Sequence, residues 1–533
     1  MSFYANAGVP LANGWNIYGW AGYQDRDAES AALPRLANNA NNITDIYPNG
    51  FLPLITTGVK DATAAIGTRG TLADWDTDIS LVYGRNNIDY GVIHTLNATY
   101  GATSPTRFDA GSLTYDEFVF NLGFVRGFDW GLAQPVNVAW GAEARREGYE
   151  IGAGESSSYD RGSVLPALTP GAQGFPGLQP SNEVDQHRTA YSGYIDVESQ
   201  ITDKFLASVA GRGEHYSDFG SEVTGKLSAR YDFTRSSALR STVSTGFRAP
   251  SLQQEFFTST ATVFTNAVPF DTGTFPATSA IARTLGAQDL DPEKSTNYSL
   301  GAVFRFGGFD ATLDAYRINI RDRVVLSENL SGGDVTALLA PFNVTAARFF
   351  INGVETRTDG IDAVLHYPLD TDQAGRFDFT LAGNYNDTDV TKVQTGTSVL
   401  PGVVLFARQN QLRYEEGTPR TKVSLGTDWS YRTTIGTLGA TLRGTRYGEV
   451  LAPGTLADGS ADVPIDPSWV VDLELRADLN GNVGVAIGAE NLLDEYPSEV
   501  PTALNTTAAA PFSQFSPYGF NGRFVYARAS YKW

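Results

Sequence analysis

Alternation of apolar and polar residues over runs of about nine to twelve positions is the feature that most constrains this chain. In the stretch 222–233, Val223, Leu227 and Tyr231 share one face, while Lys226 and Arg230 fall on the other. Similar runs occur at 297–306, 376–386, 422–431 and 469–479. A period of two is typical of β-strands. Ordinary strands have about five or six residues, whereas a tilted strand that crosses a bilayer needs about nine to eleven. The pattern therefore predicts membrane-spanning strands.

No apolar run in the sequence approaches the roughly eighteen or more residues of a membrane helix. Only helices and closed barrels satisfy every backbone polar group in lipid, so a membrane protein with this sequence must be a barrel. The hydrophobic content of 42% is ordinary. A barrel tolerates an ordinary average because its lipid-facing residues alternate with polar ones.

The connections between the predicted strands alternate in length. Short ones are expected at 234–238, 307–308, 371–375, 432–436 and 480–482. Long ones are expected at 24–63, 86–114, 150–187, 249–294, 321–354, 388–418, 449–467 and 491–521. Tight turns at one rim and large loops at the other are typical of an antiparallel barrel. We expect roughly nineteen strands in one all-β domain. Soluble sandwiches, propellers and β-helices also alternate, but their strands are shorter or recur at a fixed period.

The chain ends on "GRFVYARASYKW", a strand pattern that continues to the last residues. Tyr531 and Trp533 share its apolar face. Because an unpaired edge in lipid is costly, we expect this strand to close the barrel by pairing with the first one. The alternative is an ordinary edge strand that ends at a surface.

Charge and residue content exclude several classes of function. The net charge of −20 makes a nucleic-acid partner improbable, and with 0 Cys no thiol chemistry is possible. No nucleophile elbow or phosphate-binding loop occurs, and no metal-ligand spacing joins the four histidines, His94, His187, His215 and His366. The segment 458–466 offers oxygen ligands that suit calcium but lacks the full spaced motif. We predict no enzyme, no cofactor and no metal.

Four phrases resemble the barrel motifs of TonB-dependent outer-membrane receptors: "STGFRAPSLQQEFF" at 244–257, "LDPEKSTNYSLGAVFR" at 290–305, "NLLDEYP" at 491–497 and the terminal "GRFVYARASYKW". The resemblance implies a 22-stranded transmembrane antiparallel β-barrel in the bacterial outer membrane. It also implies a plug inside the barrel and a periplasmic energy-transducing TonB complex as partner. A terminal aromatic residue resembles the end signal that the family's assembly machinery reads.

The sequence departs from that family at its start. Phe3, Ala5 and Ala7 already follow the strand pattern, and no signal peptide precedes them. We expect residues 1–533 to form the barrel domain, with the plug, the signal peptide and at least the first strand absent.

The resemblance implies energy-coupled import of a scarce nutrient, either a siderophore, a cobalamin-like molecule or an oligosaccharide. The alternative is a plugless passive pore or a surface-binding barrel. A third alternative is a secreted β-rich glycoside hydrolase.

Ligand recognition is expected in the long loops. Four aromatic residues of one loop are candidates to contact an apolar or sugar-ring face of a small molecule: Phe256, Phe257, Phe264 and Phe270. The alternative is that these rings pack the loops against each other.

Overall fold

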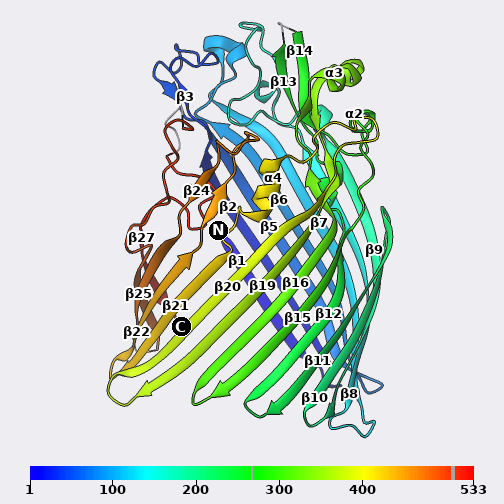
Figure 1. Cartoon of the computed structure of the whole chain (residues 1–533), viewed down its shortest axis with the longest axis vertical. Helices are drawn as coiled ribbons and strands as arrows, with labels where there is room; N and C mark the ends of the chain where they lie inside the picture. The colour runs from blue at the N-terminus through cyan, green and yellow to red at the C-terminus, as the bar shows by residue number, and fades with distance from the viewer. Residues whose placement is uncertain (266–267, 480, 506–510, 533) are drawn as a thin grey trace.

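The computed structural model describes residues 1–265, 268–479, 481–505 and 511–532, and within 261–271 it describes only the backbone. A single antiparallel sheet of 19 strands forms a curved wall, and its strands are tilted with respect to the long axis of the molecule (Figure 1). No described helix is long and apolar enough to span a membrane. The sheet follows chain order: β1 (Ser2–Pro10), β2 (Asn16–Ala31), β5 (Leu54–Leu72), β6 (Trp75–Ile93), β7 (Arg107–Phe128), β8 (Val136–Gly152), β9 (Val184–Thr202), β10 (Phe205–Tyr216), β11 (Gly220–Thr234), β12 (Ser237–Arg248), β15 (Glu293–Phe306), β16 (Phe309–Leu326), β19 (Phe350–Thr371), β20 (Gly375–Val393), β21 (Thr421–Thr433), β22 (Gly436–Tyr447), β25 (Ser468–Leu479), β26 (Val483–Glu490) and β27 (Phe524–Tyr531).

The connections alternate between tight turns and long loops, as the sequence predicts. β5 and β6 are joined by Ala73 and Asp74, both with positive φ, and β15 and β16 by Gly307 and Gly308, also with positive φ. Two consecutive residues with positive φ match the right-handed twist of a hairpin. The long loops gather at the opposite rim (Figure 1).

Several strands are longer than the sequence pattern predicts, and β7 and β19 each reach 22 residues. The expected long connection at 86–114 shrinks to 94–106 because β6 and β7 continue into it. These extensions lie at the end of the strands that carries the long loops, beyond the length that a bilayer requires. Both faces of such an extension can be polar, so the alternation that marks a strand fades there.

The two faces of the wall differ as predicted. On β11, Val223 and Leu227 are 79% and 60% exposed and point outward. Arg230 lies on the opposite face, where its guanidinium pairs with the Asp232 carboxylate at 2.8 Å. A large exposed apolar surface is the face that lipid covers, and a charged inner face suits a wet lumen.

Many inner-face arginines have carboxylate partners on their own or a neighbouring strand. Arg248 on β12 contacts Glu293 on the neighbouring β15 at 2.7 Å, and Arg305 contacts Asp310 across the next hairpin at 3.0 Å. Arg212 pairs at 2.6 Å with Glu214, a same-face acid two residues away on its own strand.

On the inner face of the wall, aromatic rings lie over glycines of the neighbouring strand. A side chain added at the glycine would collide with the facing tyrosine ring in four cross-strand pairs: Tyr18 with Gly67, Tyr194 with Gly141, Tyr316 with Gly360, and Tyr526 with Gly488. A ring that shields a strand glycine stabilises the sheet at its weakest position.

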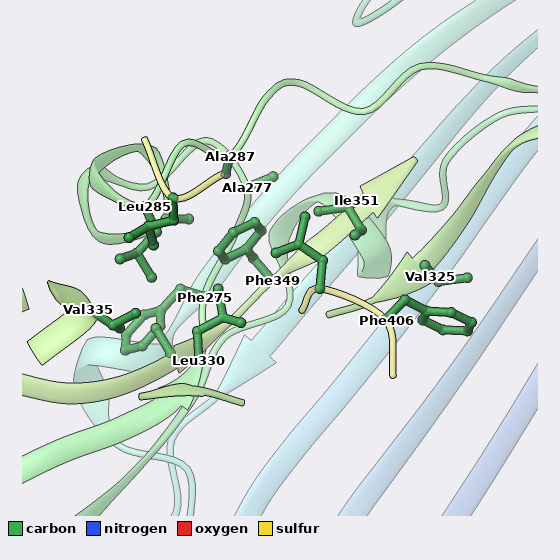
Figure 2. Packing of buried hydrophobic residues seen from close by; sticks show 14 of the residues in the cluster. Phe275, Ala277, Leu285, Ala287, Val325, Leu330, Val335, Phe349, Ile351 and Phe406 are labelled. Atoms are coloured by element: carbon green, nitrogen blue, oxygen red, sulfur yellow. The ribbon is translucent and has the colours of Figure 1, made fainter. Parts of the chain in front are cut away.

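The long loops have buried apolar clusters of their own. The largest includes Phe275, Leu285, Leu339, Phe349 and Leu405, each no more than 6% exposed (Figure 2). Its residues come from α2 (Ala280–Thr284), α3 (Gly333–Leu339), β17 (Leu330–Ser331), β18 (Val344–Arg348), from β16 and β19, and from the connections between these elements. The short turn η4 (Ala340–Phe342) follows α3. β18 pairs with β14 (Val268–Thr274), which pairs with β13 (Ser259–Thr265). The remaining short elements are β3 (Arg35–Leu36), β4 (Gly50–Phe51), β23 (Val450–Ala452), β24 (Val463–Ile465), η1 (Ala98–Thr103), η2 (Ser156–Ser158) and η3 (Pro180–Asn182).

The first and last strands, β1 and β27, are the two edges of the sheet. Among the described residues, β1 pairs only with β2 and β27 only with β26. In an antiparallel sheet of 19 strands in chain order, the first and last strands run in the same direction. Direct contact between them would therefore be parallel. Bacterial single-chain barrels have an even number of antiparallel strands, so antiparallel closure requires an odd number of further strands.

Candidate functional site at the mouth of the barrel

A buried ion pair fastens one loop to the inner wall. Arg188 on β9 and Glu147 on β8 face each other across the ladder, with side chains 6% and 7% exposed. The Arg188 Nε donates to Glu147 Oε2 at 2.6 Å, and the Tyr115 hydroxyl donates to Glu147 Oε1 at 2.6 Å. The Arg188 Nη1 donates to the carbonyl of Pro250 at 2.6 Å. A guanidinium that binds a carboxylate and a backbone carbonyl together fixes the loop that follows β12.

The short helix α1 (Leu252–Phe256) begins at that contact. Ser251 caps it: the Gln254 amide donates to Ser251 Oγ at 3.1 Å, and the Ser251 amide donates to Gln254 Oε1 at 3.0 Å. Reciprocal capping of this kind stabilises a helix start. Leu252, 1% exposed, packs in a buried cluster with Tyr149 and other residues of the wall. The phrase "FRAPSLQQEFF" thus encodes a strand end, an anchor and a docked helical turn.

Glu255 of α1 carries an unusual carboxyl group. Burial raises its pKa to about 8, with a further contribution from the neighbouring Asp218 carboxylate. The Arg188 guanidinium opposes this shift without reversing it. The Glu255 Oε2 atom is buried without a hydrogen-bond partner in the described part of the chain. The carboxyl is therefore largely protonated at neutral pH, when α1 is docked.

The predicted aromatic residues divide into two groups. Phe256 and Phe257 are half-buried and pack against the cluster around Leu252 and Tyr149. This placement favours the alternative that the rings pack the loops, and it leaves ligand contact as a prediction. The backbones of Phe264 and Phe270 belong to β13 and β14, and their side chains lie outside the described part of the structure.

The helix α4 (Arg408–Glu415) folds onto the inner face of the wall. On β19, Ile361 and Leu365 are exposed on the outer face, so Thr356 has the parity of the inner face. Thr356 is 3% exposed and accepts a 3.1 Å hydrogen bond from Arg323 Nη1. The Arg323 guanidinium lies 4.6 Å from the ring centroid of Tyr414 on α4. These contacts place α4 inside the mouth (Figure 1).

A recess of about 620 Å³, the recess under α4, lies between α4, the end of β16 and β18. Val324, Val325 and Phe406 supply its apolar surface, and Arg348 and Arg413 line it as well. Its volume is in the range of small-molecule sites, roughly 300–1,000 Å³. No sequence pattern singles out these arginines, because they come from segments that only the fold brings together.

A second recess of about 640 Å³ lies against β22, β25 and β26. Two of its three acids have hydrogen-bond partners. The Tyr526 hydroxyl donates to Glu474 at 2.8 Å, and Asp472 accepts from the Asn491 amide at 2.9 Å. These contacts join the recess to the hydrogen-bonded wall.

The acidic segment 458–466 has no set of free oxygen ligands either. Asp462 pairs with Arg408 of α4, and the Asp458 carboxylate accepts hydrogen bonds from Ser460. Within the described ranges, no group of three or more histidines and acids is arranged around a common point.

Tyr531 ends β27 and is 62% exposed at the unpaired edge of the sheet. Trp533 lies outside the described residues. The closing role of both residues stays a prediction.

Residues 3–492 match the family model for the "TonB dependent receptor-like, beta-barrel". The chain belongs to this family. It is a protein of the bacterial outer membrane, and its TonB-dependent receptor barrel is the transmembrane antiparallel type that the sequence predicts. The family and its structural neighbours are receptors and transporters rather than enzymes.

A relative of this TonB-dependent receptor barrel is the iron-regulated outer membrane virulence protein of Vibrio cholerae. The two are 25% identical over 191 residues, which make up 34% of this chain and 25% of that protein. The matched region therefore spans only a quarter of the length of the relative.

Solved structures resemble the whole barrel. The FpvAI–pyocin S2 complex matches with a TM-score of 0.63 and 14% identity, and covers 99% of this chain and 63% of its counterpart. The ferric enterobactin receptor PfeA of Pseudomonas aeruginosa matches with a TM-score of 0.61 and 14% identity, and the match covers 99% of this chain and 77% of PfeA. The FrpB iron transporter of Neisseria meningitidis matches with a TM-score of 0.62 and 11% identity, and the match covers 99% of this chain and 72% of FrpB. At these identities the likeness concerns the fold.

Proposed function

We propose that this barrel is part of an outer-membrane receptor that imports a scarce iron chelate of the siderophore class. The family match over residues 3–492 carries the proposal. The iron-regulated relative and the siderophore-receptor neighbours support iron chelates over cobalamin-like molecules and oligosaccharides. The ligand would enter at the mouth, where α1 and α4 are held against the inner wall.

We further propose that residues 1–533 form the barrel domain and that a plug and further strands are encoded outside this sequence. Two observations support this division. The chain covers 63% of the matched chain in the FpvAI–pyocin S2 structure, and the 19 antiparallel strands of the described residues require an odd number of additional strands for antiparallel closure. Three more strands would give the 22 that the family resemblance implies. The energy-transducing TonB complex would act through the plug-bearing region.

The first test reads the coding sequence immediately upstream of Met1. A plug-coding frame continuous with this chain supports the receptor, and its absence supports the alternative of a plugless pore or surface-binding barrel. The second test deletes the gene and measures uptake of radioactive iron supplied as a panel of ferric siderophores. Uptake of one chelate that is lost on deletion, and also lost when the energy-transducing complex is inactivated, supports the proposal. Uptake that persists without energy coupling would contradict import by this mechanism.

A further inference from the structure

The recess under α4 has an excess of positive charge in a chain whose net charge is −20. Arg348 and Arg413 line it, and the guanidinium of Arg323 stacks on Tyr414, another lining residue. Each donates a hydrogen bond to a neutral side chain: Arg323 to Thr356 at 3.1 Å, Arg348 to Thr274 at 2.9 Å, and Arg413 to Asn410 at 2.9 Å. Most arginines of the inner wall have carboxylate partners, such as Arg230 with Asp232.

Among the described residues, none of these three guanidinium groups has a carboxylate within 4.0 Å. The acid that lines the recess, Glu328, accepts hydrogen bonds from neighbouring groups through one of its oxygens. Its Oε1 accepts from the Ala407 amide at 2.8 Å and from Asn410 Nδ2 at 2.6 Å. An arginine has five N–H donors, so most donors at this site have no protein acceptor in the described structure.

Two of the guanidinium groups also lie over aromatic faces. Arg323 is 4.6 Å from the centroid of the Tyr414 ring, and Arg413 is 5.3 Å from that of Phe515. Stacking of this kind orients a guanidinium plane and leaves its edge free to bind an oxyanion in bidentate geometry. Val324, Val325 and Phe406 supply an apolar surface beside these edges.

We infer that the recess under α4 is an anion-binding subsite for a small molecule that presents oxyanions beside an apolar or aromatic face. The inference rests on the proposed function and narrows its ligand class. A neutral oligosaccharide offers these guanidinium groups no counter-charge. A carboxylate-bearing or catecholate-bearing chelate would satisfy them. The inner-face position of α4 assigns the site to a ligand that enters the mouth rather than to a lipid of the outer surface.

The test is equilibrium binding to the purified protein in neutral detergent, measured by calorimetry. The probes are citrate, pyrophosphate and 2,3-dihydroxybenzoate, with maltotriose as the neutral comparison. We expect saturable binding of at least one anion that weakens with added salt, and none of maltotriose. Arg348→Met and Arg413→Met should each weaken anion binding by about 10- to 100-fold, the loss expected for a charged hydrogen bond.

Arg408→Met is the matched control, because Arg408 lies on the same helix but already pairs with Asp462. This substitution should leave anion affinity within about twofold of the wild type. Heat-dependent gel mobility establishes that each variant retains its barrel. The inference is overturned if none of the three anions binds saturably, or if Arg348→Met and Arg413→Met bind them as the wild type does. Because no energy coupling enters this assay, loss of anion binding with intact energised uptake refutes the subsite alone. Intact anion binding without energised uptake refutes the import proposal alone.

Discussion

We predict that the carboxyl group of Glu255 makes docking of α1 dependent on pH. In the docked state, burial and the neighbouring Asp218 raise its pKa from 4.5 to about 8, while in the undocked loop the ordinary value applies. The charged groups that face it are Asp218, Arg188 and Glu147. Because the docked state holds the proton more tightly, its stability falls as the pH rises from about 4.5 to about 8 and is constant outside that window.

The size of the effect follows from the same two values. Docking should weaken about tenfold for each pH unit inside the window, up to about 5 kcal/mol across the whole of it. Glu255→Gln keeps the shape of the side chain and removes its charge. The variant should therefore dock as tightly at pH 8 as at pH 5.

Hydrogen exchange of the peptide that contains α1 measures this equilibrium. The amides of Glu255 and Phe257 are the reporters, since they donate to the carbonyls of Ser251 and Gln253 at 3.0 and 2.9 Å. Comparison of wild type and Glu255→Gln at each pH cancels the intrinsic pH dependence of exchange. The variant should gain protection relative to the wild type as the pH rises through the window. A protection ratio that is the same at pH 5 and pH 8 would refute the reasoning.

Three further substitutions test other parts of the structure. Arg188→Met leaves Glu147 buried without its cation and should destabilise the docked loop by about 3–5 kcal/mol, with partial recovery when Glu147→Gln is added; equal protection of α1 in both variants would contradict this. Leu227→Lys places a charge on the lipid face and should cost about 2–4 kcal/mol near the bilayer midplane in urea titrations of vesicle-inserted protein, whereas Ser228→Lys on the inner face should cost far less; equal costs would argue against the assigned faces. Gly360→Ala forces a methyl group into the facing tyrosine ring and should cost about 1–3 kcal/mol in the same titration, an effect that an unchanged midpoint would disprove.

The sequence predicts the wall well because lipid and water impose a period of two on every strand that separates them. On β11, Val223 and Leu227 lie on the outer face and Lys226 lies on the inner face, as their alternation in the sequence predicts. The tight turns also have local signals, such as Gly307 and Gly308. Where strands rise above the bilayer, neither face is constrained to be apolar. For this reason the sequence pattern predicts a loop at 86–114, where β6 in fact continues to Ile93 and β7 begins at Arg107.

The groups at the mouth were not predictable because their contacts join distant segments. Arg188 and Glu147 are 41 positions apart and meet through the pairing of β8 with β9. Arg323 and Tyr414 meet only because α4 folds back onto the inner wall. One signal was available: "FRAPSLQQEFF" contains a helix-capping pattern at Ser251 and Gln254 that predicts an ordered turn in the loop.

The division between wall and loops has a consequence for how such a receptor can change its ligand. The wall is stabilised by its backbone ladder and by lipid, and on β11 its exposed apolar residues stay outside the loop clusters. The loops bury Phe275, Leu285 and Phe349 in a cluster of their own. The side chains of Arg348 and Arg413 in the recess under α4 are exposed and do not belong to the buried cluster of the loops. The residues that line the mouth can therefore change at small cost in stability, whereas a substitution at Arg188 or Gly360 alters contacts within the sheet of the wall.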